Sequence, residues 1–208
     1  MAEQKKKTKV EEKKEIVAEQ PASKWINKQR TLIVCSRGVN HVQRDLANDL
    51  CALLPHAKKE VKIERKGAFE ELMELCQMRS CNNFIYFESR KRKHLYLWIG
   101  RAPNGPSYQF YVPNSMDKIN ITPIVIPSDE LKLTGNCIKG SRPILSFDGA
   151  FDKELYLNLF KEMAVNTFGT PNFHPQSKPF VDHVFSFNFY DNRIWFRNYQ
   201  VKKNWHYK

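Results

Sequence analysis

The chain has 208 residues, of which 41% are hydrophobic and 12% aromatic, enough for one domain or two small halves around an apolar core. Lys and Arg number 34 against 22 Asp and Glu, a formal charge of +12 that favours a polyanionic partner. Residues 1–24 contain seven Lys and five Glu, a net +2, so the remaining +10 lies in residues 25–208. We therefore expect the basic charge mostly on the folded part of the chain.

Cysteine usage and motif content exclude several classes of protein. The five cysteines are an odd number without a CxxC pair, which predicts reduced, buried thiols rather than a disulfide framework or a zinc site. The N-terminus has no signal-peptide core, and no run approaches the roughly 18 apolar residues of a membrane span. No P-loop, GxGxxG or HExxH motif occurs. We expect a soluble, intracellular protein that is not an enzyme and uses no cofactor, metal, membrane or small-molecule substrate.

Composition separates an arm from a folded region. Residues 1–23 are rich in Lys, Glu and Gln and predict a disordered charged arm, in which Lys5-Lys6-Lys7 is a short candidate signal for nuclear import. Residues 24–208 are expected to fold. This region divides into a first half (24–112), a loop or insertion (113–129) and a second, incomplete half (130–208).

Apolar periodicity predicts the elements of the first half. A buried strand at residues 31–35 precedes an amphipathic helix that begins near Asn40 and ends before Pro55. Residues 56–66 are interpreted as a basic connection. A second amphipathic helix and three strands complete this half: the helix uses Phe69, Leu72, Met73 and Cys76, and the strands span 83–88, 94–100 and 108–112.

The second half repeats the order of strand, helix and strands. Ile124-Val125-Ile126 is too short and too closely flanked by proline to predict a strand. A strand at residues 143–147 precedes a helix, and a Pro-rich crossover at residues 170–179 follows it. The predicted apolar face of that helix comprises Phe151, Leu155, Leu159, Phe160 and Met163. The fold class is therefore α/β, with two similar halves that each hold a mixed β-sheet and flanking helices.

A hairpin near the end of the chain carries the main candidate site. Two strands, 185–190 and 193–199, are joined by Asp191-Asn192, both of which tolerate the positive φ of tight turns. Side chains alternate across a strand, so one face of the second strand carries Arg193, Trp195, Arg197 and Tyr199 and the other Ile194 and Phe196. Guanidinium groups pair with phosphates and unstacked bases stack on flat rings, so this face suits RNA. The alternative is that Trp195 and Tyr199 are buried within a sheet covered on both faces.

Three basic segments are further candidates for phosphate contact. Arg37 follows a strand in Ser36-Arg37-Gly38, where a loop could aim backbone N–H groups at an anion. Lys139 and Arg142 belong to a second glycine-containing loop, and Arg90, Lys91, Arg92 and Lys93 form a run of four cations between two strands. The alternative for each is an ordinary connection with solvated charges.

Several sequence blocks together resemble the Brix-domain family over about residues 24–201. The blocks are Lys24–Lys28, Cys35–Gly38, Asn83–Glu88, Leu131–Cys137, Lys139–Pro143, Pro179–Phe185 and Asp191–Tyr199. The resemblance implies a fold of two similar α/β halves whose sheets are like those of anticodon-binding domains. It also implies a nucleolar, hence nuclear, factor without enzymatic activity.

The function that this resemblance implies is assembly of the large ribosomal subunit. Such a factor binds ribosomal RNA and partners that include pre-ribosomal assembly factors and ribosomal proteins. Two departures from the family are residues 114–128, which look like an insertion, and the stop at Lys208, since family members continue well past the block at residues 191–199. An incomplete second half would leave an unpaired strand edge. The alternative function is therefore a protein-interaction module that recruits assembly factors without direct RNA contact.

Overall fold

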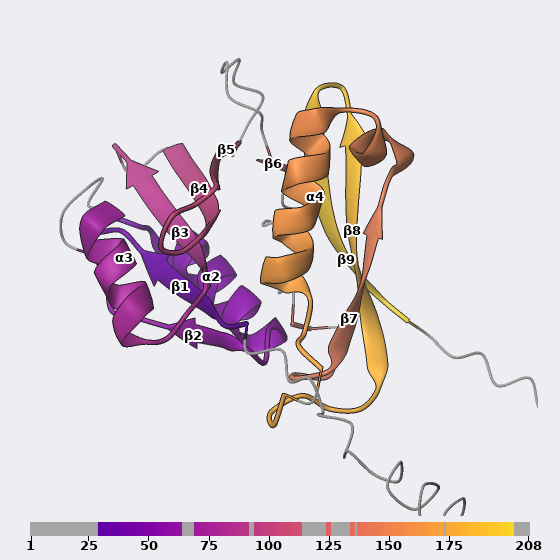
Figure 1. The fold of residues 1–208 in the computed structure, drawn as a ribbon, viewed down its shortest axis with the longest axis horizontal. Coiled ribbons are helices and arrows are strands. Elements are labelled where there is room, and N and C mark those ends of the chain that lie inside the picture. The colour runs from indigo at the N-terminus through magenta and orange to yellow at the C-terminus, as the bar shows by residue number, and fades with distance from the viewer. Residues whose placement is uncertain are drawn as a thin grey trace, which may run out of the picture.

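The structure is a computed structural model that describes residues 29–63, 69–91, 94–113, 124–125, 134–135, 137–172 and 174–201. Two mixed sheets and their helices confirm the α/β class (Figure 1). The first part of the chain contains β1 (Thr31–Cys35), α2 (His41–Leu53), β2 (Ala57–Lys59), α3 (Phe69–Met78), β3 (Asn83–Arg90), β4 (His94–Arg101) and β5 (Ser107–Val112). The second contains β6 (Ile124–Val125), β7 (Arg142–Phe147), the 3₁₀ helix η1 (Gly149–Asp152), α4 (Leu155–Phe168), β8 (Val181–Tyr190) and β9 (Arg193–Gln200).

The first sheet has the strand order β2-β1-β3-β4-β5. β1 pairs in parallel with β2 and β3, whereas β3, β4 and β5 are antiparallel neighbours. Helix α2 begins where expected because Asn40 and Gln43 form a reciprocal capping box. The short strand β2 lies inside the basic connection predicted at residues 56–66, where its lysines gave no apolar alternation to identify it.

The second sheet has the order β6-β9-β8-β7, with β7 parallel to β8 and β8 antiparallel to β9. The hairpin prediction is confirmed, since Asp191 and Asn192 have φ values of 53° and 55° at the turn. Ile124–Val125 does form a short strand, contrary to the sequence-based expectation, because it pairs in parallel with β9. Two residues next to prolines could not reveal a pairing with a strand some 70 positions away.

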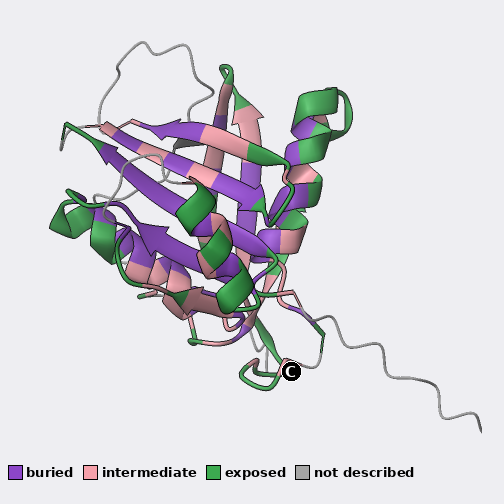
Figure 2. Cartoon of the chain, turned by 60° about the vertical axis from the view of Figure 1, so that its left-hand side comes forward, coloured by how far each residue is buried: buried purple, intermediate pink, exposed green. Residues whose placement is uncertain are grey.

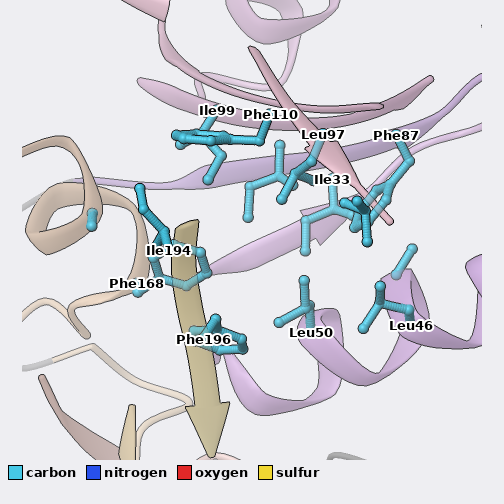
Figure 3. Close-up of a cluster of buried hydrophobic side chains, with 14 of the residues drawn as sticks. Ile33, Leu46, Leu50, Phe87, Leu97, Ile99, Phe110, Phe168, Ile194 and Phe196 are labelled. Carbon is cyan, nitrogen blue, oxygen red and sulfur yellow. The ribbon is translucent and has the colours of Figure 1, made fainter. Parts of the chain in front are cut away.

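Both sheets bury one face in a shared core, and α4 lies between them (Figure 1). The ring of Phe160 on α4 lies 5.1 Å from that of Phe110 in the first sheet and 5.9 Å from that of Phe187 in the second. Figure 3 shows Leu50 and Leu97 of the first half facing the same cluster as residues of the second half. A second cluster lies beneath α3 on the opposite face of the first sheet and includes Leu72.

The predicted apolar face of α4 is confirmed for Phe160 and Met163, and Phe151 is buried too, but the prediction is wrong for the two leucines. Leu155 is 87% exposed and Leu159 is 39% exposed. The cause is a break in helical phase: Phe151 belongs to η1, which Asp148 caps, and α4 begins only at Leu155. The side that α4 buries instead comprises Leu157, Phe160, Met163, Ala164, Thr167 and Phe168.

The carboxyl end of α4 is capped by side chains of the first half. Thr31 Oγ1 and His56 Nε2 both donate to the carbonyl of Thr167, at 3.1 and 2.9 Å, and Asn83 Nδ2 donates to that of Asn166 at 3.1 Å. These carbonyls have no partner within the helix, so the caps satisfy them and join the two halves. Burial lowers the pKa of His56 to about 4, so this ring is neutral at physiological pH with its proton on Nε2.

Candidate nucleic-acid interface

Strand β9 has one buried and one accessible face. Ile194 and Phe196 are 1% and 2% exposed, whereas Tyr199 is 47% exposed and Arg197 is also exposed. Arg193 and Trp195 are half-buried. The predicted alternation is thus confirmed, and neither aromatic residue is buried in a sheet covered on both sides.

The neighbouring strands extend this surface through their register. Ser186, Asn188 and Tyr190 of β8 pair with Arg197, Trp195 and Arg193, and Ser146 of β7 pairs with Ser186. We call this surface the outer face; it comprises Ile144, Ser146, Val184, Ser186, Asn188, Tyr190, Arg193, Trp195, Arg197 and Tyr199. Its β8 residues were not among the predicted site residues, although the alternation of Phe185 and Phe187 in the sequence is a signal that identifies them.

Arg197 lies among the aromatic side chains of the outer face. Its guanidinium carbon is 5.6 Å from the centre of the Trp195 ring, and its Nη1 donates to the Tyr199 hydroxyl at 3.2 Å. Within the described ranges, the salt bridges involve Arg79, Arg90 and Lys161 and neither arginine of β9. Arg197 therefore keeps an uncompensated charge beside two rings that can stack.

Lys139 and Arg142 lie on the same sheet at the end away from the hairpin. The carbonyl of Gly140, which has φ of 80°, accepts from the Lys178 N–H at 2.7 Å and fixes the turn. Lys139 is exposed, and Arg142 stands two residues before Ile144 on β7. These cations flank the outer face at the end where Ile144 and Tyr199 lie.

Arg37 and the run from Arg90 belong to the first sheet. The N–H groups of Ser36 and Arg37 donate to the carbonyls of Phe87 and Ile63, so those two amides cannot cradle an anion as expected, whereas the Arg37 side chain is exposed. Arg90 pairs at 2.9 Å with the buried carboxylate of Glu88, which raises the pKa of Arg90 and offsets its charge. Lys91 is exposed, and Arg92 and Lys93 fall outside the described residues.

The described part of the chain gives little support for a reactive thiol, a metal site or a membrane-spanning helix. Cys35, Cys76 and Cys81 are buried free thiols, and burial raises the pKa of each. No group of three or more His, Cys, Asp or Glu there could hold a metal ion. No described helix is long and apolar enough to cross a membrane.

The sequence blocks agree with comparisons to known proteins. The Brix domain matches residues 36–207, which is most of the chain. This protein belongs to the Brix domain family. It is 49% identical over 189 residues to "Ribosome biogenesis protein BRX1 homolog" of Xenopus laevis, covering 90% of this chain and 53% of that protein. It is 46% identical over 177 residues to "Ribosome biogenesis protein BRX1" of Saccharomyces cerevisiae, covering 85% and 57%.

The chain spans about half the length of these curated relatives. Among solved structures, it resembles a probable ribosomal biogenesis protein from Aeropyrum pernix K1 with a TM-score of 0.47 and 14% identity. That match covers 83% of this chain and 91% of the other. At this level of similarity, it adds nothing to the family assignment.

Proposed function

We propose that this protein acts in ribosome biogenesis, during maturation of the large ribosomal subunit in the nucleolus, by holding single-stranded ribosomal RNA on its outer face. Membership of the Brix domain family and the names of its relatives support the biological role. The role is binding rather than catalysis, and the partners are ribosomal RNA, assembly factors and ribosomal proteins. The factor holds its RNA segment until later components replace it.

The alternation of β9 is the observation that carries this proposal. The buried Ile194 and Phe196 anchor the strand in the core, so the opposite side chains must project from the other side of the sheet, which no described helix covers. Arg193 and Arg197 supply charge for phosphates, and Trp195 and Tyr199 supply rings for bases. Single-stranded RNA is the ligand that uses both kinds of group at once.

The charge of the outer face also favours a polyanion. None of its ten residues carries a carboxylate, and at one end Lys139 and Arg142 add two positive charges against the one negative charge of Asp182 on β8. A protein ligand with mixed charges would gain less from such a surface than a phosphate backbone would. Arg37 and the cations at residues 90–93 are proposed to contribute from the first sheet, at longer range.

A double substitution on β9 tests the proposal. Arg193→Ala with Arg197→Ala should weaken binding of single-stranded ribosomal RNA by several kcal/mol at most, given ~1.5–3 kcal/mol for a charged hydrogen bond. Arg101→Ala is the matched control, because Arg101 is an exposed cation on a strand of the first sheet. Fluorescence anisotropy with each folded variant measures the effect. Parental affinity in the double variant would contradict the proposed site.

The salt dependence of binding tests the electrostatic part separately. With roughly six phosphate contacts to a single strand, log affinity should fall against log salt with a slope of about −4. The double variant should show a shallower slope by roughly 1.4, since it lacks two of those contacts. An affinity that does not change with salt would contradict phosphate binding altogether.

A second candidate function is supported by the edge of the second sheet. Among the described strands, the second sheet ends at β7, whereas the equivalent position beside β1 is occupied by β2. An extended segment of another assembly factor could add to β7 by backbone hydrogen bonds. Hydrogen exchange separates the two functions: a partner strand would protect the β7 amides, and RNA would leave their exchange unchanged.

A further inference from the structure

A cavity of about 320 Å³ lies where the two halves meet, apart from the outer face. The first half contributes the segment around His56 together with Arg30, and the second contributes the crossover that follows α4. Its lining residues are Arg30, Pro55, His56, Ala57, Lys58, His174, Pro175 and Gln176. The proposed RNA-binding surface uses none of them.

The cavity has a positive wall and no negative one. Arg30 and Lys58 are the charged residues among the described ones that line it, and none of these carries a carboxylate. Lys58 Nζ donates to the carbonyl of Arg79 at 2.9 Å, which holds the ammonium group in place and leaves two of its protons for a ligand. Burial, followed by the charge of Arg30, lowers the pKa of His174, so the positive field reaches across the cavity.

The two histidines have different parts in this cavity. His56 is fixed, because its Nε2 donates to the Thr167 carbonyl and its Nδ1 is buried. His174 is more accessible, and its ring centre lies 6.5 Å from that of His56. An anion in the cavity would thus lie near the charges of Arg30 and Lys58. His174, whose Nδ1 accepts from the Gln176 N–H at 3.4 Å, would gain a proton beside it.

We propose that this cavity binds a phosphate group together with its adjoining sugar. Arg and Lys are the residues that bind phosphate in proteins, by forked hydrogen bonds and as a point charge respectively. The volume lies at the lower end of the ~300–1,000 Å³ of small-molecule sites, which suits one nucleotide unit rather than a large ligand. The phosphate belongs either to an RNA strand or to a free nucleotide.

Titration of the whole chain with inorganic phosphate, followed by NMR of the histidine ring protons, tests the site. Phosphate should shift the His174 resonance and raise the pKa of His174, while leaving His41 unaffected. Arg30→Ala with Lys58→Ala should weaken phosphate binding at least tenfold, and Lys62→Ala, an exposed lysine outside the cavity, should leave it unchanged. No shift at His174, or equal binding by the double variant, would overturn the proposal.

Two oligoribonucleotides identify the source of the phosphate. A 5′-phosphorylated trimer that competes with inorganic phosphate more strongly than its 5′-hydroxyl counterpart points to an RNA end. Adenosine monophosphate that competes when neither trimer does points to a free nucleotide. The double variant at Arg193 and Arg197 should keep the His174 response, so failure at the cavity and failure at the outer face are distinguishable.

Discussion

The two sheets differ in how many of their faces are covered. In the first sheet, α3 covers one face, and α2 and α4 lie on the core side. The burial of β3 is therefore continuous from Asn83 to Ser89, and Figure 2 shows strands of this sheet largely buried. In the second sheet, α4 covers the inner face, and no described helix covers the other. Its strand β9 alternates between buried and accessible residues instead.

Two tryptophans show what this difference means for function. Trp98 of β4 packs edge-on against Phe69 of α3 at 4.7 Å, and its Nε1 donates to Glu88 at 3.0 Å. Trp195 of β9 is half-buried with no described helix above it, and its Nε1 is buried and has no partner among the described residues. The first ring holds α3 on its sheet, whereas the second lies on a face that no described helix covers.

Substitution of each tryptophan in turn should give the largest difference in stability. It tests whether the two sheets differ in how their faces are covered. We expect Trp98→Ala to lower the free energy of unfolding by about 3 kcal/mol, because packing against α3 and the Glu88 hydrogen bond are both lost. Trp195→Ala should cost less than about 1 kcal/mol. Urea unfolding measures both. Equal losses would mean that the outer face is structural.

Acid should weaken the contact between the two halves at the carboxyl end of α4. The pKa of His56 is about 4 in the folded chain and about 6.5 when unfolded, so the unfolded state binds the extra proton. Stability is full above pH 6.5 and should fall by roughly 3 kcal/mol as the pH drops to 4. Burial lowers the pKa of His174 and His183 too, which adds loss of the same sign.

Urea unfolding across that pH range, with His56→Gln as the matched variant, separates the contribution of His56 to the pH dependence of stability. Glutamine can donate an amide proton to the Thr167 carbonyl but does not titrate, so its pH profile should be flatter. A variant profile as steep as the parent's would show that His56 is not the group responsible.

Substitution of Tyr199 tests, through RNA binding, whether a ring of the outer face stacks on a base. Loss of the ring in Tyr199→Ala should weaken binding by ~1–3 kcal/mol, the scale of one base stacked on an aromatic side chain. Tyr199→Phe keeps the ring and loses only the hydroxyl that accepts from Arg197, so it should bind nearly as the parent does. Anisotropy titrations of the two variants provide the measurement, and equal losses would argue against stacking.

The smallest effect is expected for cations of the first sheet. Lys91→Ala should weaken RNA binding by ~0.5 kcal/mol, typical of a surface charge. Arg90→Ala should weaken it less, because Glu88 already offsets the charge of Arg90. A loss at either position as large as that of the β9 double variant would place the site on the first sheet.

The sequence predicted most of this architecture where local patterns were sufficient. Alternation in β9 identified its two faces, and Asp191-Asn192 identified the turn, since both depend on residues next to each other. The buried side of α4 was predictable only in part, at Phe160 and Met163. It is determined by two sheets at once, through Phe110 of one and Phe187 of the other, and no local period reports that arrangement.

The candidate site likewise contains residues that local sequence patterns predict and residues that they do not. The alternation of a single strand predicted its β9 residues. Arg37 and Arg90 were grouped with them only because of their charge, and they lie on the other sheet. The cavity at Arg30, Lys58 and His174 could not be predicted, because its walls are more than 100 residues apart in the chain.

Photochemical crosslinking of the protein to single-stranded ribosomal RNA, with adducts located by mass spectrometry, tests the central claim most directly. We predict adducts on the peptide that contains residues 193–199, and above all on Trp195 and Tyr199. Adducts confined to the first sheet, or crosslinks to protein partners alone, would contradict it.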